Sequence, residues 1–109
     1  MAATYNITIN QHADFLRSFQ VKRNNVIFDI SGFTFEGRLK ESFNSTTHVS
    51  FTTAITDGPA GTFTLSLTDA ETGAMLPNTW VYDVIMTDTA GTKTRMLQGN
   101  AFLKQGVTP

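Results

Sequence analysis

Polar and apolar side chains alternate with a period of two along most of this chain. The two clearest runs are residues 4–10 and 62–68, in which every second residue is apolar. Successive side chains of a β-strand point to opposite faces, so each such run has one apolar face and one polar face. Gly, Asn and Asp residues that favour turns separate the runs. The pattern therefore predicts an all-β fold, an antiparallel β-sandwich formed by one domain over residues 1–109.

The composition fits such a domain and limits the classes of partner. The chain has 109 residues, of which 40% are hydrophobic and 9 are Phe, enough to bury one core. Only 16% of the residues are charged, which is low for a soluble protein, and the Thr-, Ser- and Asn-rich surface suits packing against neighbours. The net charge of -1 and the scattered Lys and Arg argue against nucleic acid or an anionic membrane as partners.

Residues 68–77 carry the only helical signal of the sequence. Thr68 and Glu71 have the spacing of a capping box, in which each side chain bonds to the free backbone amide of the other residue. Gly73 and Pro77 are expected to end the helix after one or two turns. The sequence therefore predicts one short crossover helix between the two sheets.

Strand 79–88 is expected at the centre of a sheet and covered on both sides, because apolar residues occupy both of its faces. Trp80 could stack on a sugar ring, but its alternation with Tyr82 is typical of core aromatics. Gly37 falls on the inward side of strand 33–40 and predicts a close approach by a neighbouring side chain. The residues expected in the core are Trp80, Tyr82, Phe35, Phe63 and Leu65.

Asp83 lies on the same face of its strand as Val81 and Ile85, a face expected to be buried. A buried carboxylate is costly unless it is paired and hydrogen-bonded. Arg38 or Arg95 could supply the positive charge. We therefore interpret Asp83 as one half of a structural ion pair that fixes the register of the sheet.

No group of residues indicates catalysis or metal binding. His12 and His48 are the only histidines, and neither has a nearby ligand at the spacing of a metal site. The turn at residues 57–61 lacks the Lys and the following helix of a phosphate-binding loop, and no Ser lies in a nucleophile elbow. We expect a protein that is not an enzyme and that carries no metal or cofactor.

Three residues are candidates for contacts with a partner. Tyr5 and Ile7 lie on the first strand, residues 3–10, whose unpaired edge could exchange with or add to another sheet. Both residues also fall on the face of that strand expected to point inward. Phe43 lies in a polar loop at residues 43–47, where no pattern forces it inward.

Four segments of the sequence together match the pattern of one family. Residues 29–33 resemble its Asp-Leu-Thr-Gly-Tyr turn, and residues 80–84 its Tyr-x-Tyr-Asp-Leu core strand. Residues 61–77 resemble its Gly-x-Val-Thr-Leu-x-Leu-Thr strand and the crossover with Glu-Thr and Leu-Pro that follows. Residues 91–99 resemble its Gly-x-x-x-Arg-Leu-Leu-x-Gly ending, with Met and Gln substituted. The chain is thus similar to the small immunoglobulin-like β-sandwich virion proteins of tailed bacteriophages, including the first domain of upper-baseplate proteins.

The resemblance implies an immunoglobulin-like sandwich that is a structural subunit of a phage particle, assembled in the host cytoplasm. Its partners would be other virion proteins and copies of itself, in a trimer, a hexamer or a lattice held by multivalent docking. Upper-baseplate proteins carry further domains after the sandwich, whereas this chain ends at Pro109, which favours a stand-alone adaptor or a capsid decoration subunit. Two alternatives stay open. One is a carbohydrate-binding or host-adhesion module of a fibre, with two or more exposed rings at one loop end; the other is a cellular surface domain.

Overall fold

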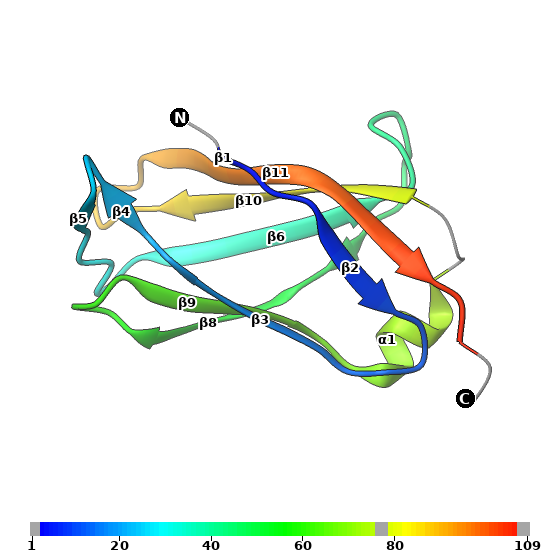
Figure 1. Cartoon of the computed structure of the whole chain (residues 1–109). Coiled ribbons are helices and arrows are strands. Elements are labelled where there is room, and N and C mark those ends of the chain that lie inside the picture. Colours follow the sequence, from blue (N-terminus) through cyan, green and yellow to red (C-terminus); the bar gives the residue numbers. More distant parts are fainter. Residues whose placement is uncertain (1–2, 76–78, 107–109) are drawn as a thin grey trace.

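Two β-sheets packed face to face, with one short helix between them in the chain, form the computed structural model of the protein (Figure 1). It describes residues 3–75 and 79–106. The larger sheet has the strand order β1-β11-β10-β6-β7, and β2 also pairs with β11. The smaller sheet has the order β3-β9-β8. The arrangement of β11-β10-β6 against β3-β9-β8 is that of an immunoglobulin-like sandwich, so the predicted fold class is confirmed.

In the larger sheet, β10 is the central strand and pairs antiparallel with β11 and β6. The strands of this sheet are β1 (Ala3–Thr4), β2 (Ile7–Asn10), β6 (Thr34–Lys40), β7 (Val49–Ser50), β10 (Thr79–Thr87) and β11 (Lys93–Lys104). β1 and β2 run parallel to β11. The prediction of a wholly antiparallel sandwich is therefore wrong for the first strand, which is also interrupted at residues 5–6.

The smaller sheet and a separate hairpin follow the turn signals of the sequence. Its strands are β3 (Phe15–Gln20), β8 (Thr52–Asp57) and β9 (Thr62–Leu67), and the hairpin consists of β4 (Lys22–Arg23) and β5 (Val26–Ile27). Asn24 and Asn25 join β4 to β5 with φ angles of 54° and 63°. Asn tolerates this left-handed region, so this dipeptide forms a tight hairpin turn.

The helix α1 (Asp69–Ala74) connects β9 of the smaller sheet to β10 of the larger one. Both hydrogen bonds of the predicted capping box are present: the Glu71 amide donates to Thr68 Oγ1 and the Thr68 amide to Glu71 Oε1. The helix passes through Gly73 and ends at its cap residue, Met75. Pro77 lies outside the described residues.

The core lies between the sheets and contains the residues predicted for it. Trp80, Tyr82, Phe63 and Leu65 are buried. Phe35 is only partly buried, but its ring stacks on Phe63 with the centroids 4.1 Å apart. Alternation therefore identified these core residues, although it could not say how deeply each one is buried.

The outer face of β10 is not covered by a second layer, contrary to expectation. Buried residues alternate strictly with exposed or partly exposed ones along the strand. Val81, Asp83 and Ile85 point outward and are only partly buried. Apolar residues on both faces suggested two covering layers, but the outward ones are shielded only from the side, by neighbouring strands.

Gly37 permits a close approach, as its inward position predicts. A Cβ atom at this position would lie 2.9 Å from Cδ2 of Phe51 and 3.4 Å from Cγ2 of Val84. Phe51 and Val84 are both buried in the core, so neither side chain has free space to move into.

We expect Gly37→Ala to lower the free energy of unfolding by about 1–3 kcal/mol, because the added methyl group overpacks the core. Urea denaturation followed by Trp80 fluorescence measures this change. Thr34→Ala, at an exposed position of the same strand, is the control and should change the free energy by less than about 0.5 kcal/mol. An equally stable Gly37→Ala protein would contradict the close approach.

Candidate functional site

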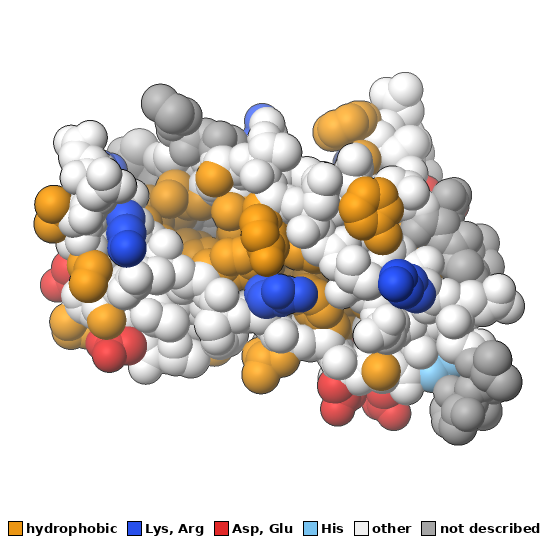
Figure 2. Space-filling view, viewed as in Figure 1, with side chains coloured by type: hydrophobic (Ala, Val, Ile, Leu, Met, Phe, Trp, Pro, Cys, Tyr) orange, Lys and Arg blue, Asp and Glu red, His pale blue; other side chains and the backbone are white. Residues whose placement is uncertain are grey.

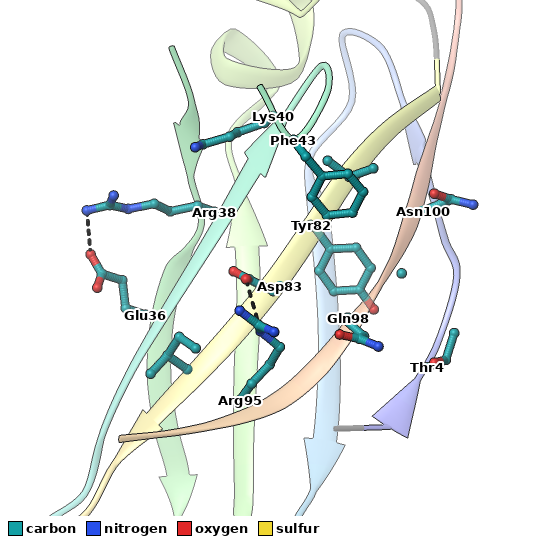
Figure 3. Close-up of a pocket in the computed structure, with 13 residues that line it drawn as sticks. Thr4, Glu36, Arg38, Lys40, Phe43, Tyr82, Asp83, Arg95, Gln98 and Asn100 are labelled. Carbon is teal, nitrogen blue, oxygen red and sulfur yellow. Dashed lines mark hydrogen bonds and ion pairs between the residues drawn. The ribbon is translucent and has the colours of Figure 1, made fainter. Parts of the chain in front are cut away.

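The outer face of the larger sheet presents polar and charged side chains in rows across β6, β10 and β11. The register places three residues in each row. The rows are Glu36–Ile85–Arg95, Arg38–Asp83–Gln98 and Lys40–Val81–Asn100. Together with Phe43 and Thr4, these residues line an open depression of about 650 Å³ (Figure 3).

A β-bulge brings Arg95 to this face. The pairing of β10 with β11 shifts between Val84 and Ile85, so that Ile85 lies opposite Arg95 and Met96 is skipped. Without the extra residue, strict alternation would turn Met96 outward and Arg95 inward. The bulge therefore creates the contact between Arg95 and Asp83 across the two strands.

The predicted ion pair of Asp83 forms with Arg95, one of its two candidate partners, but on a face that is not buried. Arg95 Nε lies 3.3 Å from Asp83 Oδ2 (Figure 3). Arg38 lies opposite Asp83 in the register, but its Nη2 contacts Oε2 of Glu36 at 2.9 Å. Glu36 is two residues away on the same strand and face, so Arg38 reaches it easily. Neither pair is buried, since the side chains of Asp83 and Arg95 are 40% and 54% exposed.

We expect Asp83→Asn to change the free energy of unfolding by less than about 1 kcal/mol, because an exposed ion pair is solvated and screened by salt. Urea denaturation at low and high salt measures the change, and any difference should shrink at high salt. A loss of several kcal/mol that salt does not reduce would contradict this surface role.

Phe43 lies beside this depression, exposed as predicted. Its side chain is 85% exposed. Figure 3 shows the ring over β10, at the end of the depression near Lys40, the last residue of β6. The polar loop thus holds an aromatic ring in water, where a contact with a partner would bury it.

The other candidate contact residues, Tyr5 and Ile7, differ in exposure. Tyr5 is 41% exposed, whereas Ile7 is 2% exposed and belongs to the core. Ile7 as an interface residue is therefore wrong, because β2 pairs with β11 and turns Ile7 inward. The Tyr82 hydroxyl donates a hydrogen bond to the Tyr5 carbonyl oxygen, and the Tyr5 amide donates to the Gln98 carbonyl oxygen at 2.9 Å.

Burial raises the pKa of Tyr82 to about 12, with a smaller contribution from Tyr5. Unfolded tyrosine titrates near pH 10. Because the raised pKa favours the neutral form in the folded state, the stability that this group contributes is complete below about pH 10 and is lost as the pH rises through about 12.

We expect Tyr82→Phe to cost about 1–3 kcal/mol at pH 7, since the carbonyl oxygen of Tyr5 loses its donor in a partly buried hydrogen bond. The variant should also lose less stability than the wild type between pH 10 and 12. Denaturant titrations across this range measure both effects, with Tyr5→Phe as the control that keeps Tyr82. The same alkaline loss in Tyr82→Phe and wild type would contradict the assignment.

The outer face of the smaller sheet differs from the first in that it carries a single formal charge, on Asp57 at one end. Its outward residues form rows by the register of β3, β9 and β8. They are Leu16–Ser66–Thr52, Ser18–Thr64–Ala54 and Gln20–Thr62–Asp57. Leu16 is the most apolar of them and is 68% exposed. Sequence reasoning missed this face because the pairing of the three strands was needed to bring its residues together.

Comparisons with known proteins add no family. No family model matches the chain, and no curated protein matches it. Within residues 3–75 and 79–106, His, Asp and Glu side chains form no cluster of three that could hold a metal ion. No helix in the described part of the chain is long and apolar enough to cross a membrane.

Proposed function

We propose that this protein is a structural subunit of a bacteriophage particle that docks onto neighbouring copies through the weakly charged outer face of its smaller sheet. The resemblance of four sequence segments to phage virion proteins supports the particle. The observation that supports docking is the low charge of the outward residues of β3, β9 and β8, among which only Asp57, at one end of the face, carries a formal charge.

A face of this kind suits repeated protein contacts. Interface cores are depleted in charged residues, because a buried charge must be desolvated and paired. Thr and Ser hydroxyl groups both donate and accept hydrogen bonds, so they can adapt to a facing surface. Leu16, 68% exposed, adds apolar area to the face.

The size of the face favours a lattice of weak contacts. Three strands of six residues cover roughly 14 Å by 20 Å, or about 300 Å². A stable interface buries roughly 800 Å² on each partner. One such contact is therefore weak alone, and repetition around a symmetric particle would supply the avidity.

We expect the protein to associate weakly at high concentration, and Thr64→Lys to keep it a monomer of 12.0 kDa. Thr64 lies on the central strand β9 and points outward, so the charge would enter the middle of the contact without touching the core. Sedimentation velocity over a concentration series measures the mass. Gln98→Lys, on the other sheet, should associate like the wild type; a wild-type protein that stays monomeric up to about 1 mM would contradict docking through this face.

A carbohydrate-binding or adhesion module is the second candidate, and one observation favours it. Phe43 and Phe102 are exposed, at 85% and 39%. Both lie toward the start of β10: Phe102 pairs with Thr79, and Phe43 follows Lys40, which pairs with Val81. Planar polar side chains such as Asn100 line the depression beside Phe43. Binding on a glycan array that Phe43→Ala removes would favour this function over docking.

A further inference from the structure

We propose that the free edge of β3 binds an extended strand of a different virion protein, which fills an apolar hollow between β3 and β11. The added strand would have about six or seven residues, apolar at alternate positions, with an acidic residue opposite Arg17. This inference rests on the proposed role as a docking subunit and adds a second surface with a partner of stated chemistry.

The first observation is an unpaired strand edge. Within the described part of the chain, β3 pairs with β9 and with no other strand. Such an edge presents backbone N–H and C=O groups that another strand can pair with. The six residues of β3 include no Pro, and Arg17 is the one charged residue among them. Arg17 points to the inward side, so it disfavours an added strand that does not supply an opposite charge.

The second observation is an uncovered apolar hollow next to this edge. Figure 2 shows hydrophobic side chains gathered between β3 and β11, beside β1 and β2. Tyr5 is 41% exposed there, and its ring meets the edge of the partly buried Phe19 ring at 5.7 Å. Phe19 in turn stacks on the core residue Phe63 at 5.6 Å. The aromatic core thus extends to the surface at this point.

The opposite side of the sandwich is bridged by the chain itself. β7 and β8 belong to different sheets and are separated only by Phe51, which is buried. The Thr53 hydroxyl also donates to the Phe35 carbonyl oxygen at 2.8 Å, which links β8 to β6. On the β3 side, the first strand pairs with β11. Beyond the turn at residues 11–14, it meets β3 through the side-chain contacts of Tyr5 with Arg17 and Phe19, which leave the backbone edge of β3 open to an added strand.

Arg17 specifies the charge of the added strand. Its Nη1 donates to the neutral hydroxyl of Tyr5 at 3.3 Å, and neither ion pair of the described residues includes it. Arg17 lies on the same side of β3 as Phe15 and Phe19. A carboxylate opposite Arg17, flanked two positions away on each side by apolar residues, would therefore match this side of the edge.

A second copy of the chain fits this edge less well. Two β3 strands paired antiparallel about Arg17 would bring like charges together. In any pairing of the two edges, Phe15 of the second copy would remain in its own core, where it is 7% exposed, and could not fill the hollow. The occupant is therefore a strand whose apolar side chains are free before it binds.

The test is a titration of the ¹⁵N-labelled protein with the peptide Ac-Thr-Val-Thr-Glu-Thr-Val-Thr-NH₂, followed by amide chemical shifts. We expect shifts at residues 15–20 and at Tyr5. The rearranged peptide Ac-Thr-Thr-Val-Glu-Val-Thr-Thr-NH₂ has the same composition but the wrong alternation, and should bind at least about fivefold more weakly. Arg17→Gln should weaken binding of the first peptide by a similar factor, whereas Lys104→Gln should leave it unchanged.

Three results would overturn the inference: no shifts up to about 5 mM peptide, equal binding of the two peptides, or shifts confined to the outer faces of the sheets. The sedimentation experiment on Thr64→Lys tests the docking function without this edge. If the peptide does not bind but the wild-type mass rises with concentration, only the strand-binding edge is overturned. If the peptide binds but the wild type stays monomeric, only docking through the outer face of the smaller sheet is overturned.

Discussion

The course of the first strand depends on the missing side chain of Gly99. A Cβ atom there would lie 2.5 Å from the carbonyl oxygen of Tyr5 and 3.0 Å from Oδ1 of Asn6. The same carbonyl oxygen accepts the hydroxyl hydrogen bond of Tyr82, and Asn6 Oδ1 accepts one from the Asn100 amide at 3.0 Å. These bonds hold the chain against β11 where the strand is interrupted, and a side chain at Gly99 would push it away.

The position of the first strand against β11 determines which edges of the sandwich are closed. Because β2 pairs with β11, Ile7 and Ile9 enter the core, and the end of the sandwich near the turn to β3 is filled. For the same reason the first strand is not available as a partner for β3. The closed end and the open edge are thus two consequences of the pairing of the first strand with β11, which Gly99 permits and the Tyr82 hydrogen bond supports.

The sequence predicted the faces of the strands better than their surroundings. Alternation placed Phe63 and Leu65 in the core and Gly37 at a close contact, since side-chain direction follows from local geometry. The pattern wrongly predicted a buried Asp83, because the apolar Val81 on the same face suggests burial whether or not a second layer covers that face. Strand pairing, the bulge beside Ile85 and the departure of the first strand are non-local, so no pattern of period two contains them.

The distribution of charge separates the possible roles of the three surfaces. On the outer face of the larger sheet, Glu36 and Asp83 already hold Arg38 and Arg95, so a partner there would have to displace or tolerate these pairs. The face of the smaller sheet has a charge only at one end, on Asp57, so its centre has none to desolvate and suits contacts that form and break readily. The edge of β3 combines unpaired backbone groups with exposed aromatic area, which together give a contact both specificity and strength. A subunit with one adaptable face and one specific edge can join a lattice of its own copies and still bind a different protein in one orientation.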